Sequence, residues 1–304
     1  MVTFVDGPVL VTVPATSANL GPGFDSLGLA LALRDEISAR VTGGPLVVRV
    51  SGEGAEDVPL DESHLVVRSM YAAFAAMGTA PPGLSLTCTN RIPHARGLGS
   101  SSAAIVAGVS LARGLVAGGT LLMGDDAVFG LAAELEGHPD NVAPAFYGGF
   151  VVSRHEEDGF HAACCDVDPR ISAVVFVPPT GVETKVARGL LPDTVPLAEA
   201  AANSGRAALL VAALAGQPEL LLPATRDYLH QEYRRPAMPE SLPLMEALRA
   251  EGVPALVSGA GPTVLAFCDG PGCSPGSVET LLARCPAGWV AHHLAIERKG
   301  VLLA

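Results

Sequence analysis

The chain has 304 residues, a length that suits one large domain or two domains of ordinary size. Hydrophobic residues make up 49% of it and charged residues 16%, which excludes an intrinsically disordered protein. The formal net charge is −12, from 31 acidic and 19 basic residues, so bulk charge disfavours binding to nucleic acid or to an anionic membrane. An anionic ligand must therefore be bound by a local group of basic side chains or backbone N–H groups, and not by the overall charge of the protein.

The first residues and the cysteines bear on the cellular compartment. No Lys or Arg precedes Arg34, so the sequence shows neither the charged start of a secretory signal nor an Arg-rich transit peptide. The six cysteines form no CxxC pair, and buried thiols account for them. The alternative that we weighed is a zinc site made of Cys268, Cys273, Cys285 and His292. We expect a soluble, cytoplasmic protein.

Hydrophobic periodicity predicts the elements in chain order. The amino-terminal half is predicted to contain a strand at 9–13, a Gly-rich loop at 14–25, a strand or helix at 26–33, strands at 37–42 and 46–50, a helix at 64–77, a strand at 84–89, and helices at 100–117 and 125–136. A polar hairpin or linker follows at 155–159. The second half is predicted to contain a strand at 173–177, helices at 197–215 and 242–251, strands at 255–257 and 263–267, a helix at 277–284 and a strand at 289–297. This mixture predicts an α+β protein with two lobes, residues 1–160 and 161–304.

The segment PHARGLGSSSAA, residues 93–104, follows a predicted strand and opens a predicted helix. Gly97 and Gly99 allow a close approach of the backbone to a ligand, and the N–H groups at the helix start attract an anion. The sequence GK[ST] is absent, so this is not an ordinary P-loop, and the acidic strand end of a dinucleotide site is also missing. A tight turn that only packs a helix on a sheet is the alternative, and the motif alone leaves both interpretations open.

Two further motifs carry chemistry. ELEGHPDN, residues 134–141, places carboxylates and an imidazole at a helix end, a set that suits metal binding and proton handling. An exposed helix terminus is the alternative, but the apolar residues that follow indicate that the chain enters a core. SGAGPT, residues 258–263, lies between two predicted strands; it is a hairpin turn or a turn that contacts the phosphate loop closely.

Together with PATSANLGPGFD at residues 14–25, these motifs resemble the family of galactokinase, homoserine kinase, mevalonate kinase and phosphomevalonate kinase. Within that family the sequence is most similar to the members that phosphorylate homoserine. The resemblance covers nearly the whole chain, and PATSANLGPGFD with HPDNVAP is far more specific than any single Gly-rich loop. It implies a two-lobed small-molecule kinase fold, with an amino-terminal ATP-binding lobe like ribosomal protein S5 domain 2 and a carboxyl-terminal ferredoxin-like lobe.

The resemblance also implies a reaction, the ATP-dependent phosphorylation of the L-homoserine side-chain hydroxyl to O-phospho-L-homoserine in threonine biosynthesis. ATP would bind along the loop, at Pro93, Gly97, Leu98, Gly99, Ser100, Ser101, Ser102 and Ala103. Mg²⁺ would be held by Ser101 and Glu134, with Glu136 as the competitor for Glu134. The only lysines, Lys185 and Lys299, lie outside the loop, so Mg²⁺, backbone N–H groups and the helix dipole must meet the phosphoryl charge, with an arginine as a further candidate.

Homoserine is a zwitterion, so its pocket needs a carboxylate for the ammonium group and arginine for the carboxylate. By resemblance, Asn19 and Asp25 take the ammonium group, and Arg188 and Arg234 take the carboxylate. Only one of Arg234 and Arg235 is expected in the cleft if the stretch is extended, because alternate side chains then face opposite ways, and by family resemblance it is Arg234.

The remaining residues follow from family position. His138, Asp140 and Asn141 face the substrate hydroxyl, with Asp140 and Asn141 as the catalytic pair, and the substrate-binding set also contains Gly259 and Gly261. Whether Asp140 removes the hydroxyl proton or only orients the hydroxyl stays open at this point.

Two other functions were weighed. A kinase for another small alcohol, such as mevalonate, would act on an acid without an ammonium group and would not need Asp25. A non-catalytic small-molecule sensor is suggested by the ferredoxin-like lobe, but the intact loop, Glu134 and Asp140 argue against it. The expected partners are L-homoserine and ATP, with no nucleic acid and no membrane, and a homodimer is the assembly that we considered.

Overall fold

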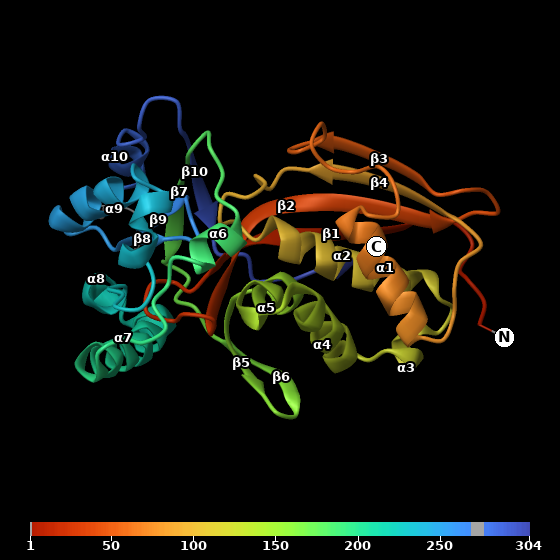
Figure 1. Ribbon diagram of the computed structural model, residues 1–304, viewed down its shortest axis with the longest axis horizontal. Helices are drawn as coiled ribbons and strands as arrows, with labels where there is room; N and C mark the ends of the chain where they lie inside the picture. Colours follow the sequence, from red (N-terminus) through yellow and green to blue (C-terminus); the bar gives the residue numbers. More distant parts are fainter. Residues whose placement is uncertain (1, 269–276) are drawn as a thin grey trace.

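The computed structural model describes residues 2–268 and 277–304, whose strands form two sheets (Figure 1). In these residues the first sheet has seven strands: β1 (Val9–Ala18), β2 (Leu27–Val41), β3 (Val47–Gly52), β4 (Leu84–Asn90), β5 (Phe150–Glu156), β6 (Gly159–Cys165) and β11 (Leu302–Leu303). Its order is β11-β1-β2-β4-β3, and β5 pairs with both β2 and β6. The second sheet has the order β10-β7-β9-β8, made of β7 (Ser172–Val177), β8 (Ala255–Val257), β9 (Val264–Cys268) and β10 (Val290–Ala295).

Helices cover each sheet. Those of the first lobe are α1 (Leu65–Ala76), α2 (Ser100–Leu115), α3 (Gly119–Leu122), α4 (Asp125–Glu136) and α5 (Pro139–Tyr147). Those that follow are α6 (Thr184–Arg188), α7 (Leu197–Gly216), α8 (Leu221–Ala224), α9 (Ser241–Ala250) and α10 (Val278–Leu282), with 3₁₀ turns η1 (Pro218–Leu220) and η2 (Glu232–Ala237). The α+β class and the two-lobed architecture predicted from the sequence are confirmed.

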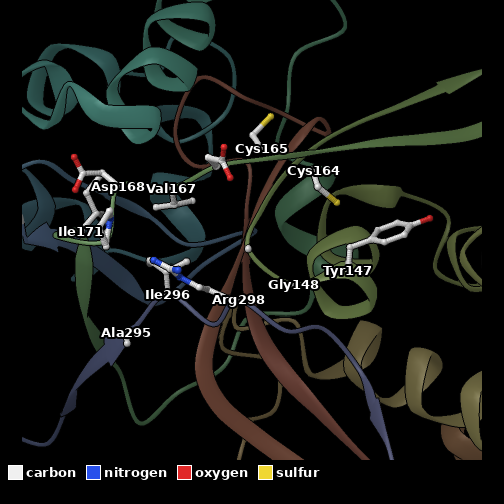
Figure 2. Close-up of a pocket in the computed structure, with 13 residues that line it drawn as sticks. Tyr147, Gly148, Cys164, Cys165, Val167, Asp168, Ile171, Ala295, Ile296 and Arg298 are labelled. Atoms are coloured by element: carbon white, nitrogen blue, oxygen red, sulfur yellow. The ribbon is translucent and has the colours of Figure 1, made fainter.

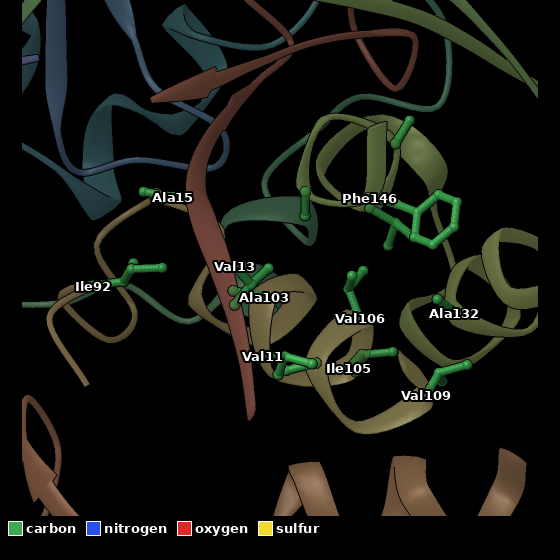
Figure 3. Packing of buried hydrophobic residues seen from close by; sticks show 14 of the residues in the cluster. Val11, Val13, Ala15, Ile92, Ala103, Ile105, Val106, Val109, Ala132 and Phe146 are labelled. Carbon is green, nitrogen blue, oxygen red and sulfur yellow. The ribbon is translucent and has the colours of Figure 1, made fainter. Parts of the chain in front are cut away.

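The core of the first lobe lies between β1 and α2 (Figure 3). Val11 and Val13 alternate on the inner face of β1, and both are fully buried. The small residues of α2 let it approach its neighbours closely. A Cβ on Gly108 would lie 2.6 Å from the carbonyl oxygen of Val66 in α1, so the two helices touch where only glycine fits. This packing fixes the start of α2, which carries the predicted phosphate loop.

Three local predictions differ from the structure. The strand predicted at 9–13 continues to Ala18, because its ladder to β2 resumes after a bulge at Pro14 and Ala15. The segments predicted separately at 26–33 and 37–42 form the single strand β2. Helix α5 was not predicted, since its prolines are typical helix breakers; Pro139, however, lies in the first turn, where a missing N–H costs little.

The polar run 155–159 forms the hairpin between β5 and β6, the first of the two predicted alternatives, and not a linker. Residues 161–165 therefore lie with the first sheet, and the chain passes to the second sheet only between Cys165 and Ser172. The predicted division after residue 160 falls inside this hairpin. At the other end of the chain, β11 returns to pair with β1. Among the described residues, no helix is long and apolar enough to cross a membrane.

Candidate active site

A cavity of about 270 Å³ lies where the start of α2, the 19–25 loop, α6 and η2 meet. Of the residues predicted from the sequence, it is lined by Asn19, Asp25, Gly97, Gly99, Ser100, Ser101, His138, Asp140, Asn141, Arg188, Arg234 and Gly259. The predicted residues that do not line it are Pro93, Leu98, Ser102, Ala103, Glu134 and Gly261. Residues more than 200 positions apart in the chain thus meet in one cavity that both lobes contribute to.

The predicted phosphate loop, residues 93–104, is in contact with the 258–261 turn. Ser258 Oγ donates a hydrogen bond to the Gly97 carbonyl oxygen at 2.6 Å, and a Cβ on Gly97 would lie 2.3 Å from the Ser258 carbonyl oxygen. The close contact between this turn and the loop, predicted as one of two alternatives, is therefore confirmed.

Gly99 is glycine for a reason that the sequence did not reveal. It begins α2 with a φ of 70°, in the left-handed region, and a Cβ there would lie 1.9 Å from Thr16 Oγ1. Position 99 must therefore be glycine because a larger side chain would collide with Thr16 of β1. Leu98 and Ala103 are fully buried, so they pack in the core beneath the loop and do not contact a ligand in the cavity.

The start of α2 has the features of an anion site. The helix is 16 residues long, and no acidic residue lies in its first turn. Its free N–H groups and its dipole both favour a negatively charged group there. Ser100 and Ser101 line the cavity at this point.

Glu136, and not Glu134, lies beside the loop hydroxyls. Ser101 Oγ and Ser102 Oγ both donate to Glu136 Oε1, at 2.6 and 2.8 Å, and Glu136 lines the cavity. Glu134 is exposed and does not line it. Residues two apart on a helix point about 200° away from each other, so only one of the two faces the loop. The carboxylate beside the loop serines is therefore Glu136, the competitor named from the sequence, and not Glu134.

His138 and Asp140 form a pair at the start of α5. Asp140 is buried, and His138 Nδ1 lies 2.9 Å from its Oδ1. Burial of His138 opposes its charged form, but the hydrogen bond and charge of Asp140 raise the pKa of His138 above its usual value. The imidazole therefore donates Nδ1–H to the carboxylate. Next to it, Asn141 Oδ1 accepts a hydrogen bond from Thr16 Oγ1 at 2.7 Å.

The predicted ammonium-binding residues are joined to other parts of the site. Asn19 Nδ2 donates to the Gly259 carbonyl oxygen at 2.9 Å, and its Oδ1 accepts from the Asp25 N–H at 3.0 Å. Asp25 and Arg188 form a two-pronged ion pair, with Nη1 at 2.9 Å from Oδ2 and Nη2 at 2.8 Å from Oδ1. The hydrogen bond to Asp25 raises the pKa of Arg188. Two residues predicted for opposite ends of a zwitterion thus neutralise each other here.

Arg234 is buried, with only 1% of its surface exposed, and no carboxylate of residues 2–268 or 277–304 forms an ion pair with it. Its Nη1 donates to His230 Nδ1 at 3.0 Å and to the Gly259 carbonyl oxygen at 3.2 Å, while its Nε has no partner. Burial, followed by the charge of Arg188, lowers the pKa of Arg234 to about 10. A buried cation of this kind is costly unless an anion joins it.

The structure places Arg234 inside and Arg235 outside, but the extended conformation that we assumed for this stretch is wrong. The segment is not extended but forms the 3₁₀ turn η2. Arg235 points outward, where it pairs with Glu232 and Glu246.

Sequence reasoning missed two residues that hold Arg234. His230 is fully buried, and its Nε2 lies 2.8 Å from the Gly21 carbonyl oxygen. It donates there, and its Nδ1 accepts from Arg234. Phe24 stacks on His230, with ring centroids 5.3 Å apart, and lies under the guanidinium groups of Arg188 and Arg234. The signal that could have identified His230 is its position four residues before Arg234, a spacing that brings two side chains together in a helical turn.

A second cavity, of about 250 Å³, adjoins the phosphate loop and was not predicted. It shares Ser100 and Ser101 with the first cavity, and its other lining residues include Ile37, Val58, Pro59, His64, Leu65 and Val66. His64 is buried, and its Nδ1 has no hydrogen-bond partner. Burial, followed by the charge of His94, lowers the pKa of His64, so this imidazole is neutral.

A larger cavity, of about 560 Å³, contains none of the predicted site residues (Figure 2). Figure 2 shows Tyr147 and Cys164 on one side of it and Asp168 and Ile171 on the other. Of the zinc set that we weighed, Cys273 lies outside the described residues. Within residues 2–268 and 277–304, no group of three or more His, Cys, Asp or Glu is arranged to hold a metal ion.

The site can be compared with known proteins. The model for the GHMP kinases N terminal domain matches residues 64–149, and that for the GHMP kinases C terminal matches residues 207–274. Homoserine kinase of Streptomyces avermitilis is 53% identical to the chain over 292 residues, which are 96% of this chain and 94% of that protein. Homoserine kinase of Clavibacter michiganensis is 49% identical over 293 residues, 96% of this chain and 92% of that protein.

Solved structures agree with these relatives. The crystal structure of homoserine kinase from Cytophaga hutchinsonii matches with a TM-score of 0.84 and 27% identity, over 98% of this chain and 97% of that one. The chain therefore belongs to the GHMP kinase family, the family that its motifs resemble, and within it groups with the homoserine kinases.

Proposed function

We propose that this protein transfers the γ-phosphoryl group of ATP to the side-chain hydroxyl of L-homoserine. The hydroxyl oxygen forms a bond to the γ-phosphorus, the bond to the β–γ bridging oxygen breaks, and ADP leaves. The products are ADP, O-phospho-L-homoserine and the proton of the hydroxyl. The family membership and the names of the relatives support this reaction.

The observation that carries the proposal is the buried, unpaired guanidinium of Arg234 in the same cavity as the phosphate loop. Among the described residues its Nε has no hydrogen-bond partner, so an anionic group of the substrate supplies one. A carboxylate matches the fork of a guanidinium group. A small acid is therefore the substrate class, and its carboxylate binds at Arg234.

The ion pair of Asp25 and Arg188 selects a zwitterion. When homoserine enters, its ammonium group takes the place of Arg188 at Asp25, and its carboxylate offers Arg188 a new partner. In this exchange Asp25 keeps a cationic partner, and the substrate carboxylate is shared by Arg188 and Arg234. Mevalonate has no ammonium group and would leave Asp25 without a partner once Arg188 turned to its carboxylate.

ATP spans the two adjoining cavities in this proposal. Its phosphates lie at the start of α2, and its adenosine lies in the second cavity, against the apolar side chains of Val58, Pro59 and Leu65. Ser100 and Ser101 line both cavities, so they mark the point where the two ends of the nucleotide join.

Ser101 and Glu136 fit Mg²⁺, since both offer oxygen atoms, the ligands that this ion prefers. One carboxylate and one hydroxyl, completed by ATP phosphates and water, are typical of Mg²⁺ sites in kinases. The ion would offset negative charge on the transferring phosphoryl group. Ser102 is buried and holds the carboxylate of Glu136 in place.

Asp140 orients the acceptor. Its Oδ1 is taken by His138, and its second oxygen is available to accept a hydrogen bond from the substrate hydroxyl. Phosphoryl transfer has a loose transition state, in which positioning and charge stabilisation supply most of the rate. A carboxylate already hydrogen-bonded to His138 suits such a positioning role.

An assay of ADP release with Mg²⁺, ATP and four candidate acceptors tests the function. We expect turnover on L-homoserine and at least tenfold lower kcat/KM on L-serine, L-threonine and mevalonate, since each lacks a matched end group or length. Turnover on mevalonate with none on homoserine would refute the assignment.

A further inference from the structure

Three arginines that the active site does not use meet in one surface cavity. Arg206 on α7, Arg226 after α8 and Arg249 on α9 line a cavity of about 350 Å³, together with Leu222 and Pro223. We call these three residues the arginine cluster. Figure 1 shows α8 between α7 and α9 in the second lobe, and the cluster shares no lining residue with the cavity that contains the phosphate loop.

The cluster has no negative charge of its own. Among the described residues, no carboxylate lies within 4.0 Å of any of its three guanidinium groups. Burial, followed by the charges of Arg226 and Arg206, lowers the pKa of Arg249. Three like charges are thus held together in a chain whose net charge is −12.

Arg249 is fixed by the fold, whereas the other two keep donors for a ligand. Nη1 of Arg249 donates to Thr225 Oγ1 at 2.8 Å and to the Ala255 carbonyl oxygen at 2.9 Å, and its Nη2 donates to the Leu222 carbonyl oxygen at 2.8 Å. Arg206 uses one hydrogen bond, from Nη1 to the Pro223 carbonyl oxygen. Arg226 is exposed and lies over the ring of Tyr228, 5.1 Å from its centroid.

We propose that the arginine cluster binds a small phosphorylated molecule at a site separate from the active site. A phosphate group carries a charge near −2 and several acceptor oxygens, so it satisfies several guanidinium groups at once. The negative charge of the whole chain disfavours a polyanionic macromolecule, whereas the cavity suits a small ligand. The site itself does not depend on the kinase activity, whereas its linkage to homoserine binding rests on the proposed function.

The cluster is joined to the substrate side of the active site by short contacts. Thr225, which Arg249 binds, lies against Gly21, where a Cβ would be 2.5 Å from the Thr225 carbonyl oxygen. Asn203, one turn before Arg206 on α7, donates to the Pro22 carbonyl oxygen at 2.7 Å. Both contacts fix the loop that carries Asn19 and Asp25.

A second connection runs through residue 227. Asp227 follows Arg226 directly, and its carboxylate accepts hydrogen bonds from the backbone N–H groups of Leu229, His230 and Gln231. These residues lead to Arg234, which His230 holds. A ligand that pulls the three arginines together therefore acts on both elements that bind homoserine, and occupancy of the cluster changes homoserine affinity.

Calorimetry with pyrophosphate as the probe tests the site. The double variant Arg206→Gln/Arg226→Gln removes two charges from the cluster and leaves Arg249, which the fold requires. The control is Arg154→Gln, since Arg154 is an exposed arginine paired with Glu156 on the β5–β6 hairpin. Binding at the phosphate loop is common to all these proteins and cancels in the comparison.

We expect the control to bind pyrophosphate at the cluster and each single variant, Arg206→Gln and Arg226→Gln, to weaken that binding about tenfold, as for the loss of a charge-assisted hydrogen bond. Titrations with O-phospho-L-homoserine and ADP then distinguish a phosphorylated amino acid from a nucleotide. Identical pyrophosphate isotherms in the double variant and the control would overturn the site.

The linkage has its own readout, the dissociation constant of homoserine measured without ATP. Pyrophosphate at the phosphate loop affects this constant equally in both proteins, so the difference between them reports the cluster. We expect the pyrophosphate-dependent change to be at least twofold larger in the Arg154→Gln control than in the double variant, because linked sites affect each other reciprocally. An equal response of both proteins would overturn the linkage. Neither readout needs catalysis, so failure here is distinguishable from failure of the kinase assignment.

Discussion

At the scale of single residues, Arg234 and Arg235 make a matched pair. Arg234→Lys removes the fork that binds a carboxylate from a buried position, whereas Arg235→Lys changes an exposed ion pair. Losing a charge-assisted contact in a buried pocket costs about 2–5 kcal/mol. We expect Arg234→Lys to lower kcat/KM for homoserine by roughly 30-fold or more.

Steady-state kinetics with both substrates varied checks this prediction. The KM for ATP should change little in either variant, since the nucleotide binds at the α2 loop. Arg235→Lys should keep kcat/KM within about twofold of the parent, as for most exposed pairs. A homoserine-specific defect in Arg235→Lys, with Arg234→Lys normal, would contradict the placement of the substrate carboxylate.

Glu136 and Glu134 form a second matched pair. Glu136→Gln should raise the Mg²⁺ concentration needed for half-maximal activity by roughly tenfold, because an amide replaces the one carboxylate beside Ser101. Glu134→Gln should leave that requirement unchanged. Titration of activity with Mg²⁺ at saturating ATP measures both, and the reverse result would return the metal site to Glu134.

Residue identities were predictable from the sequence where a motif is local, and less so where partners are distant. The resemblance named most residues that line the cavity. It did not show that Asp25 pairs with Arg188, 163 positions away, or that Glu136 and not Glu134 faces the serines. Such choices depend on helix rotation and on tertiary approach, neither of which a linear pattern contains.

At the scale of elements, the start of α2 depends on its contact with β1. Gly99→Ala should destabilise the fold as well as weaken ATP binding, because its Cβ would overlap Thr16 Oγ1. Gly149→Ala is the control: its φ of 66° carries the same left-handed cost, but nothing lies within 4 Å of the added Cβ.

We expect Gly99→Ala to lower the free energy of unfolding by about 1–3 kcal/mol more than Gly149→Ala does, as for other overpacked sites. Denaturant titrations of both variants measure the difference. Adding Thr16→Ala to Gly99→Ala removes the overlapping oxygen and should restore part of the loss. Equal destabilisation by the two alanines would show that the Thr16 contact does not restrict position 99.

Element prediction succeeded where periodicity is uninterrupted and failed where tertiary pairing decides. Helices α1, α2, α4, α7 and α9 lie within a few residues of the predicted ranges. Strand β2 was divided in two because Arg34 and Asp35 interrupt its apolar pattern. Asp35 is nevertheless buried, because its carboxylate accepts hydrogen bonds from the backbone N–H groups of Arg91 and Ile92. These hydrogen bonds form only in the assembled sheet, so the sequence pattern around Asp35 does not predict them.

At the scale of the whole molecule, each lobe contains a buried neutral histidine, and these two groups contribute to the pH dependence of stability below pH 6.5; His138, whose pKa is raised, contributes above it. His64 lies in the first lobe and His230 in the second, and burial is the main cause that lowers the pKa of both. In the unfolded chain each takes up a proton near pH 6.5, its ordinary pKa. Between that pH and the lower native pKa, the unfolded state binds more protons than the native state, so acidification favours unfolding.

Stability should therefore fall as the pH decreases below 6.5, by at most about 1.4 kcal/mol per pH unit for each histidine. Thermal unfolding at several pH values between 5.5 and 7.5 in constant low salt measures the slope. His64→Gln should flatten it, because one of the two protonation differences is removed, while His155→Gln on the exposed β5–β6 hairpin should leave it unchanged. His64 also lines the second cavity, where adenosine is proposed to bind. If bound adenosine requires a neutral imidazole, saturating ATP should steepen the decrease of the parent's stability with falling pH. His64→Gln should lack this additional decrease. A pH-independent midpoint in the parent protein would contradict the neutral state of both buried imidazoles.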